Sequence, residues 1–390
     1  MSDILDKAIT SVTLSKQAFF HFIVANEVGS NGSHQCGFYI QKGVAPYLFD
    51  TVPQRGSNAK LNLRIRWQDT FETDSVLTYY GVGTRNEYRI TCFGRNFPFL
   101  RDEYIGSMVV FARLSKTFFE AFILKTEDDI ENFLIQLRLS STDCDKFISS
   151  RQDSDLNTEI EKVLGSTDTF LGTDEMGSMA RSAWNAANMG ISSLAQPDKV
   201  LTGWYNCEEL LFKILEDRVY HIQLTTPFYT CEAAASFANM MLNRRKARAG
   251  KSLEHHLAAM FRLHRLKFEE QVRTEGNKRP DFIFPDGASY HDILFPTEKL
   301  VFLGAKTTCK DRWRQVLNEA DRIRDKYLFT LQQGVSSAQM DEMRAEHLHL
   351  VVPKMNIQMF PKEQRTSLIS LADFINLVKE PETISEYLHI

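Results

Sequence analysis

The chain has 390 residues, of which 43% are hydrophobic and 11% aromatic, and its net charge is −4. This length favours two domains, and the apolar share is high enough to exclude global disorder. The slightly acidic balance does not attract phosphate over long distances. Any contact with nucleic acid therefore depends on local basic patches.

The cysteines are scattered and form no C-x-x-C pair. They are Cys36, Cys92, Cys144, Cys207, Cys231 and Cys309. This pattern argues against a zinc site and against a disulfide framework, and it favours a reducing, cytoplasmic location. The first residues, MSDILDKAIT, lack the features of a signal peptide, and no apolar run is long enough to span a membrane. We therefore expect a cytoplasmic protein without a membrane partner.

The region 1–168 is predicted to be a β-rich domain. A helix is expected at Lys16–Glu27, followed by short segments of strand character between clusters of Pro, Gly, Asn and Asp. The expected strands are Gly37–Gln41, Leu61–Trp67, Leu77–Tyr80, Glu87–Phe93, Met108–Leu114 and Thr117–Leu124, and a second helix is expected at Glu127–Leu139. Many short strands with few helices favour a barrel or pseudobarrel.

The region 169–200 has weak periodicity and is rich in Ser, Ala, Gly, Asn and Met. We interpret it as a linker that is partly helical around Met179–Met189. Beyond it, in 201–390, helical and strand patterns alternate, which predicts an α/β domain with a mixed sheet. Its expected helices are Cys207–Tyr220, Cys231–Ala247 and Lys251–Arg265, and its expected strands are Lys267–Val272, Asp281–Phe284, Leu300–Ala305 and His349–Val352.

The stretch Leu300–Tyr327 groups charged residues in an unusual way. Its apolar start predicts a buried strand that ends on Lys306. Its second part has apolar residues at spacings of three and four, which predicts a helix that runs to Tyr327. Arg312 and Glu319 would then share one face of this helix.

Asp281 and Lys306 resemble the skeleton of the PD-(D/E)XK nucleases, in which a Pro-Asp pair opens one strand and a lysine closes the next. The second acid of that pattern would stand at position 304, where this chain has Gly304. Glu319 can supply this carboxylate, and Mg2+ needs only one or two carboxylates besides water and phosphate oxygens. Lys306 would then lie beside the attacking water and the phosphate. The alternative is that Asp281 is a turn residue and Glu319 a solvated helix residue.

Longer motifs resemble the EcoRII-type restriction endonucleases. In the second domain they are NRRKARAGKSLEHHL, TEGNKRPDFIFP, SYHDILFP and AKTTCKDRWRQVLNEAD, and in the first they are GSHQCGFYI and GTRNEYRIT. The resemblance implies a Mg2+-dependent type II endonuclease that cuts double-stranded DNA at a short palindromic site, CC(A/T)GG. It also implies a variant nuclease fold whose second acid comes from the helix.

The resemblance assigns roles to individual residues of the second domain. The matching positions are Asp281, Lys306 and Glu319 for the catalytic core, Glu254 for a further acid, Tyr290 for a tyrosine near the site, and Lys310, Asp311 and Arg312 for reading C·G pairs. Lysine and arginine donate to guanine, and aspartate accepts from cytosine, which agrees with the last role. Glu254 has a second interpretation, as a first-turn acid favoured by the helix dipole.

In the first domain the resemblance implies an effector domain, similar to the plant pseudobarrel DNA-binding domains, that binds a second copy of the site. Arg85, Glu87 and Arg89 alternate and would share one strand face, joined by His34 and Tyr39. Without the resemblance, a solvated sheet face explains this alternation better. A palindromic target also implies a homodimer.

Two other classes remain as competitors. One is a non-catalytic DNA-binding protein with a decayed nuclease domain. The other is a structure-specific repair nuclease, which would lack base readers such as Lys310 and Arg312.

Overall fold

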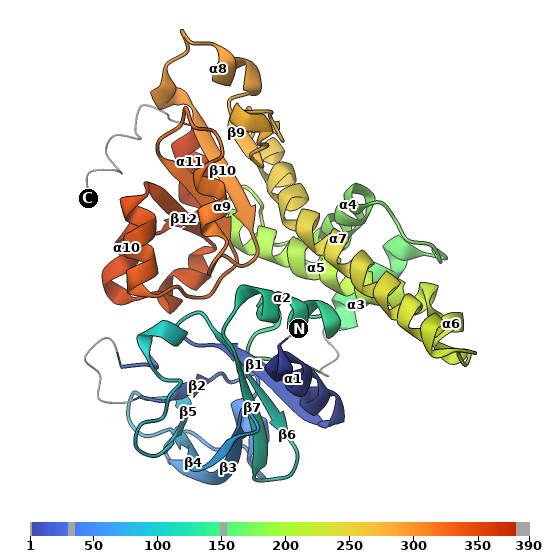
Figure 1. Cartoon of the computed structure of the whole chain (residues 1–390), viewed down its shortest axis with the longest axis vertical. Helices are drawn as coiled ribbons and strands as arrows, with labels where there is room; N and C mark the ends of the chain where they lie inside the picture. The colour runs from blue at the N-terminus through green and yellow to red at the C-terminus, as the bar shows by residue number, and fades with distance from the viewer. Residues whose placement is uncertain (1, 30–35, 149–153, 380–390) are drawn as a thin grey trace. The chain divides into compact units, whose positions relative to one another are not determined.

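The structure, a computed structural model, describes residues 2–29, 36–148 and 154–379 (Figure 1). It divides into two compact units. Unit 1 comprises Met1–Arg151, Gln332–Asp341 and Gln358–Arg365, and unit 2 comprises Gln152–Leu331, Glu342–Ile357 and Thr366–Ile390. Within the described ranges, no helix combines the length and the apolar composition that crossing a membrane requires.

Unit 1 is built on a seven-stranded sheet in the order β1-β6-β7-β3-β4-β5-β2. Neighbouring strands are antiparallel, except that β3 and β7 are parallel. The strands are β1 (Gln17–Phe22), β2 (Phe38–Ile40), β3 (Ala59–Trp67), β4 (Phe71–Tyr80), β5 (Glu87–Thr91), β6 (Met108–Arg113) and β7 (Phe118–Leu124). The helices are α1 (Asp3–Leu14), α2 (Glu127–Gln136) and the short 3-10 helices η1 (Ala45–Leu48), η2 (Asp102–Tyr104) and η3 (Ser141–Asp143).

Both faces of this sheet are buried at strands β1 and β6. Side chains alternate between the faces along a strand, so Phe19 belongs to one apolar cluster, around Trp67, while Phe20 belongs to the other. Residues of α1 and α2 complete the second cluster. Because β1 is buried on both faces, it lacks the polar alternation of a strand, and the helix expected at Lys16–Glu27 is wrong.

Unit 2 contains a six-stranded mixed sheet in the order β13-β12-β11-β10-β9-β8, which confirms the expected α/β character. Strands β10 to β13 are parallel, and β9 is antiparallel to both β10 and β8. The strands are β8 (Glu269–Glu270), β9 (Phe282–Phe284), β10 (Val301–Lys306), β11 (Lys326–Thr330), β12 (Leu348–Val352) and β13 (Ile369–Ser370). The sequence patterns did not predict β11.

Eleven α-helices are described along the chain, nine of them beyond residue 153. These nine are α3 (Ser154–Leu164), α4 (Thr173–Ala187), α5 (Pro197–Val219), α6 (His221–Thr225), α7 (Cys231–Leu263), α8 (Gly287–His291), α9 (Trp313–Leu317), α10 (Ser337–Ala345) and α11 (Leu371–Lys379). Short 3-10 helices are η4 (Glu275–Asn277), η5 (Thr297–Lys299), η6 (Lys354–Met359) and η7 (Lys362–Ser367). The two helices expected at Cys231–Ala247 and Lys251–Arg265 form the single long helix α7 (Figure 1).

The segment expected as a linker, 169–200, holds a packed helix, and residues 152–168 also belong to unit 2 rather than to the first domain. Met176, Ala180 and Trp184 of α4 are buried in the apolar core that α5 and α7 share with the sheet. The buried face of α4 consists largely of Gly and Ala, which carry little hydrophobic signal. This explains why the sequence pattern indicated weak periodicity where a buried helix lies.

Candidate active site

The expected aspartate and lysine meet at the ends of two neighbouring strands. Because β9 runs antiparallel to β10, Asp281, which precedes β9, lies beside the end of β10 that carries Lys306. One Asp281 oxygen, Oδ2, accepts a 2.8 Å hydrogen bond from Ala305 N and lies 3.6 Å from Lys306 Nζ. Asp281 lies in a bend before β9 and is buried, so its carboxylate is not solvated.

Two more carboxylates lie within electrostatic range of this pair. Burial, followed by repulsion from Asp281, raises the pKa of Glu254 to about 7. The same two causes, in the same order, raise the pKa of Glu319 to about 7. Lys306 opposes both shifts. The structure therefore brings together Glu254, Asp281, Lys306 and Glu319, which are distant in the sequence.

Glu254 lies far along α7, which begins at Cys231. It is therefore not a first-turn acid, and the helix-dipole interpretation of this residue is wrong because the expected helix start at Lys251 does not exist.

Gln271 joins two of these carboxylates and was missed in the sequence. Its Nε2 donates to Asp281 Oδ1 at 3.2 Å and to Glu254 Oε2 at 3.4 Å. Gln271 follows β8 and has a φ of 55°, in the left-handed region that non-glycine residues rarely adopt. A glutamine at the end of an expected strand is no signal by itself, because only the pairing of β8 with β9 brings it to Asp281.

Glu319 reaches the site from a loop and not from the helix that the sequence predicts. Helix α9 ends at Leu317, and β11 begins at Lys326, so the expected helix to Tyr327 is wrong. Ala320 adopts a left-handed φ of 55°, which interrupts helical geometry directly after Glu319. Glu319 is therefore half-buried on an irregular segment and is not a solvated helix residue.

The donor set suits a hard divalent cation. Glu254, Asp281 and Glu319 offer carboxylate oxygens, the ligand type that Mg2+ prefers. The pKa values of Glu254 and Glu319 are raised first by burial and then by repulsion from the charge of Asp281. A bound cation would relieve this repulsion, so the residues present fit the expected metal.

The Tyr290 hydroxyl is bound by a further carboxylate, that of Glu275. Its hydroxyl donates to Glu275, at 2.6 Å from Oε2 and 2.8 Å from Oε1. Burial, together with this hydrogen bond, raises the pKa of Tyr290 above its ordinary value. The hydroxyl is thus held by a carboxylate outside the candidate site.

The three residues expected to read bases lie in the turn between β10 and α9. Lys310 is buried, Asp311 is exposed, and Arg312 is half-buried at the N-cap position of α9. They follow Lys306 by only a few residues, so this turn and the candidate active site belong to one continuous segment.

In unit 1 the structure brings together three of the five residues expected for the effector domain. Tyr39 of β2 pairs with Arg89 of β5, and Arg89 Nε lies 3.4 Å from Glu87 Oε1. Burial raises the pKa of Tyr39, and Glu87 adds to this shift. Arg85 is exposed and precedes β5, so it does not share the strand face as expected, while His34 lies outside the described residues.

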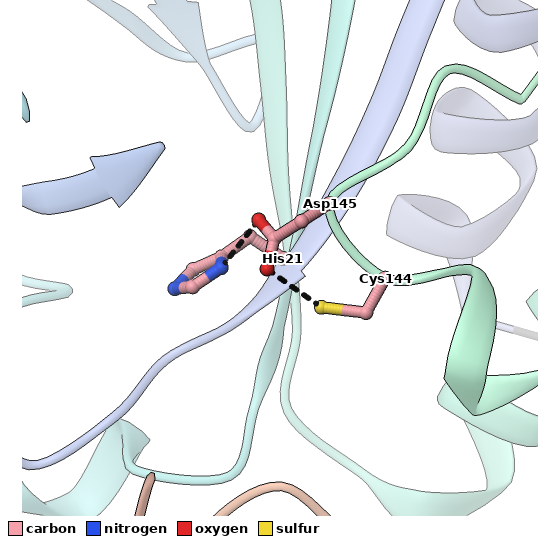
Figure 2. A group of neighbouring side chains, drawn as sticks. All are labelled: His21, Cys144 and Asp145. Atoms are coloured by element: carbon pink, nitrogen blue, oxygen red, sulfur yellow. Dashed lines mark hydrogen bonds and ion pairs between the residues drawn. The ribbon is translucent and has the colours of Figure 1, made fainter. Parts of the chain in front are cut away.

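A buried polar cluster supports the strand that carries Tyr39. His21 Nδ1 lies 2.9 Å from Asp145 Oδ1, and His21 Nε2 lies 3.0 Å from Glu27 Oε2 (Figure 2 shows the first of these). Burial raises the pKa of Cys144 to about 12, and its thiol donates to Asp145 at 3.3 Å (Figure 2). Glu27 also accepts from the backbone N of Tyr39, at 2.5 Å.

Comparisons with known proteins cover most of the chain. Residues 12–143 match the family described as "Restriction endonuclease EcoRII, N-terminal", and residues 212–375 match "EcoRII C terminal". The chain is 34% identical over 367 residues to the "Type II restriction enzyme EcoRII" of Escherichia coli, which covers 90% of this chain and 91% of that protein.

Two solved structures are also similar to part of the chain. "Metal-depleted Ecl18kI in complex with uncleaved, modified DNA" has 18% identity and a TM-score of 0.43, and covers 60% of this chain and 85% of that one. "Restriction endonuclease PspGI-substrate DNA complex" has 14% identity and a TM-score of 0.42, and the match covers 56% of this chain and 93% of that one. The two family matches and the identity to the Escherichia coli enzyme establish that this chain belongs to the EcoRII family of type II restriction endonucleases, which are site-specific DNA endonucleases.

Proposed function

We propose that this endonuclease depends on Mg2+ and that Glu254, Asp281 and Glu319 bind the metal beside Lys306. The observation that supports this assignment is the ion pair between Asp281 and Lys306, whose charges act on two further half-buried carboxyl groups, Glu254 and Glu319, with pKa values raised to about 7. Groups with such shifted pKa values cluster at functional sites.

Each residue has a distinct role in this proposal. Mg2+, when bound, would activate a water molecule and stabilise the charge that develops on the phosphate. Lys306 donates to a phosphate oxygen or to the attacking water, and its ammonium offsets the developing negative charge. The hydrogen bonds from Ala305 N and Gln271 to Asp281 hold that carboxylate in place, so it needs no rearrangement during the reaction.

We further propose that Lys310, Asp311 and Arg312 read bases in the major groove, where Asp311 and Arg312 are accessible and the buried Lys310 would reach a base once this turn rearranges. Their turn lies directly after Lys306 in the chain, which would couple recognition of the site to placement of the scissile phosphate. Bidentate donors to guanine and an acceptor for cytosine amino groups suit a target that resembles CC(A/T)GG. One active site per subunit in a homodimer would cut both strands of such a palindrome.

For unit 1 we propose an effector role, in which it binds a second copy of the recognition site. Tyr39, Glu87 and Arg89 lie together on neighbouring strands β2 and β5, and they offer donors and an acceptor for base edges. Arg85 would contribute from the loop before β5, and His34 from the segment before β2.

Digestion of a mixed DNA substrate, followed by sequencing of the ends, tests the nuclease proposal. With Mg2+ we expect discrete fragments whose ends share one short sequence, and with a chelator we expect none. Asp281→Asn should bind DNA specifically without cutting it. Specific binding without any cleavage by the native protein would instead support a decayed nuclease, and random ends would support a repair nuclease.

A further inference from the structure

The segment that carries Glu319 lacks regular secondary structure of its own. Helix α9 ends at Leu317, and Ala320 is buried in a left-handed conformation with a φ of 55°. Such a conformation costs energy in a non-glycine residue and persists only where surrounding contacts maintain it. Contacts from elsewhere in unit 2 must therefore hold the backbone on either side of Glu319.

Glu275 accepts a hydrogen bond from the backbone just after Glu319. Its Oε2 accepts from Asp321 N at 3.2 Å and from the Tyr290 hydroxyl at 2.6 Å. The same hydroxyl accepts a weaker hydrogen bond from Arg322 N at 3.4 Å. One carboxylate and one hydroxyl thus bind two consecutive backbone amides just after Glu319 and Ala320.

Two basic side chains hold the same segment. The Arg322 guanidinium donates to a group of backbone carbonyls at the end of α8 and beyond it, those of Ser289, Tyr290, Asp292 and Phe295. Before Glu319, Lys278 Nζ donates to Asn318 O and lies 3.8 Å from Asp321 Oδ1. Residues on both sides of Glu319 are therefore attached to the segment 275–295.

We propose that Glu275 is a positioning residue of the nuclease, which acts with Tyr290 to hold Glu319 toward Asp281. This inference rests on the proposed role of Glu319 as a metal ligand, and it gives Tyr290, which was expected near the site, a supporting role. Glu275 is exposed, so its truncation leaves no cavity in the core. Removing it should therefore disturb the placement of Glu319 more than the stability of the fold.

Direct metal binding tests this proposal independently of cleavage. Tb3+, a hard cation that also prefers oxygen ligands, can be titrated into the full-length protein by its luminescence and displaced by Mg2+. We expect Glu275→Ala to weaken the affinity for both ions by about tenfold or more, as is typical for partners of metal ligands. The unfolding temperature of Glu275→Ala should stay close to that of the native protein.

Three further variants sharpen the test. Tyr290→Phe removes one donor to Glu275 and should weaken Mg2+ affinity less than Glu275→Ala does. Glu275→Gln keeps one acceptor oxygen, so its Mg2+ affinity should also lie between those of the native protein and Glu275→Ala. Glu298→Ala removes an exposed carboxylate of η5 and should leave affinity unchanged. Cleavage by Glu275→Ala should need more Mg2+ for half its maximal rate and should recover at high Mg2+.

The outcomes separate this inference from the proposed function. If Glu319→Gln abolishes metal binding and cleavage while Glu275→Ala behaves like the native protein, the positioning role is wrong and the active site stands. If Glu319→Gln binds Mg2+ and cleaves normally, or the native protein binds neither ion, the proposed site itself is wrong. Every variant, including Glu275→Gln, could instead lose metal affinity together with unfolding temperature. This result would show that the hydrogen bonds of Glu275 stabilise the fold, and it would also overturn the proposal.

Discussion

Val316 of α9 occupies the space into which a side chain at Gly304 of β10 would point. A Cβ added at Gly304 would lie 3.1 Å from Val316 Cγ1 and 3.5 Å from Leu328 Cδ1. The position of the second acid in the PD-(D/E)XK pattern is therefore filled by apolar packing in this chain. Under the proposed assignment, this contact gives a physical reason for a second carboxylate from another segment. Glu319 lies three residues after Val316.

Restoring an acid at this position should not restore the site. We expect Gly304→Asp to lower the free energy of unfolding by about 2 kcal/mol or more, because it places an unpaired carboxylate among apolar side chains. Gly304→Ala should cost less, since only its Cβ meets Val316. Urea unfolding measures the change in the free energy of unfolding for both variants. The double variant Gly304→Asp/Glu319→Ala should remain without cleavage, and cleavage by it would contradict this account of the site.

Removal of the lysine or of the loop carboxylate should separate cleavage from binding. Lys306→Ala and Glu319→Ala should each lower the rate of cleavage by about a hundredfold or more, because in the proposed mechanism Lys306 acts on the phosphate and Glu319 binds the metal. Gel shifts without Mg2+ should show specific DNA binding close to that of the native protein. Cleavage near the native rate by either variant would refute the catalytic assignment.

Base reading in the turn after β10 can be measured as lost discrimination. Arg312→Ala should weaken specific binding by about 1–3 kcal/mol and leave non-specific binding little changed. Arg265→Ala removes the same charge from an exposed position at the end of α7 and serves as the control. Competition gel shifts with cognate and single-mismatch duplexes decide the question. An equal loss of specific binding in Arg312→Ala and Arg265→Ala would indicate a general effect of the removed charge.

The buried His21 predicts a pH dependence of the stability of unit 1. Burial lowers the pKa of His21, but Glu27 and Asp145 raise it by more, so that it lies well above its ordinary value of 6.5. A raised pKa in the folded state means that the stabilisation is complete below about pH 6.5 and is lost as the pH rises through the folded value. His21→Gln should therefore cost about 3 kcal/mol near neutral pH or below, and less as the medium becomes alkaline.

Denaturant unfolding of the native protein and His21→Gln between about pH 6 and pH 10 would measure this difference. The exposed His221 provides the control, since His221→Gln should show no such trend. A difference between the native protein and His21→Gln that grows with pH would contradict the charged state assigned to His21.

The sequence patterns were sufficient to predict most strands and the charged residues at their ends. Alternation and turn residues predicted β2 to β7 in unit 1 and β8, β9, β10 and β12 in unit 2. The pair Asp281 and Lys306 was recognised because a Pro-Asp pair and a lysine stand at the ends of successive strands. Recognition of the family came from long motifs in both halves of the chain.

Strand β1 and helix α4 were not predicted correctly. Strand β1 is buried on both faces, and α4 presents Gly and Ala to its neighbours, so neither shows a clear polar and apolar period. The periodicity from Trp313 to Tyr327 fits a helix, yet the chain turns at Ala320 and continues as β11. Apolar spacing alone does not distinguish a helix from two short buried segments.

By itself, the sequence determined which residue types can carry the chemistry. It also determined which strands bring Asp281 and Lys306 to one edge of a sheet. Both findings depend only on local periodicity and on the residues at strand ends. Only the tertiary structure decided how Glu254, Gln271 and Glu319 reach that edge, and that Tyr290 is held by Glu275. The reason is that these groups meet through contacts between distant segments, and a left-handed turn at Ala320 is maintained by such contacts and not by local preference.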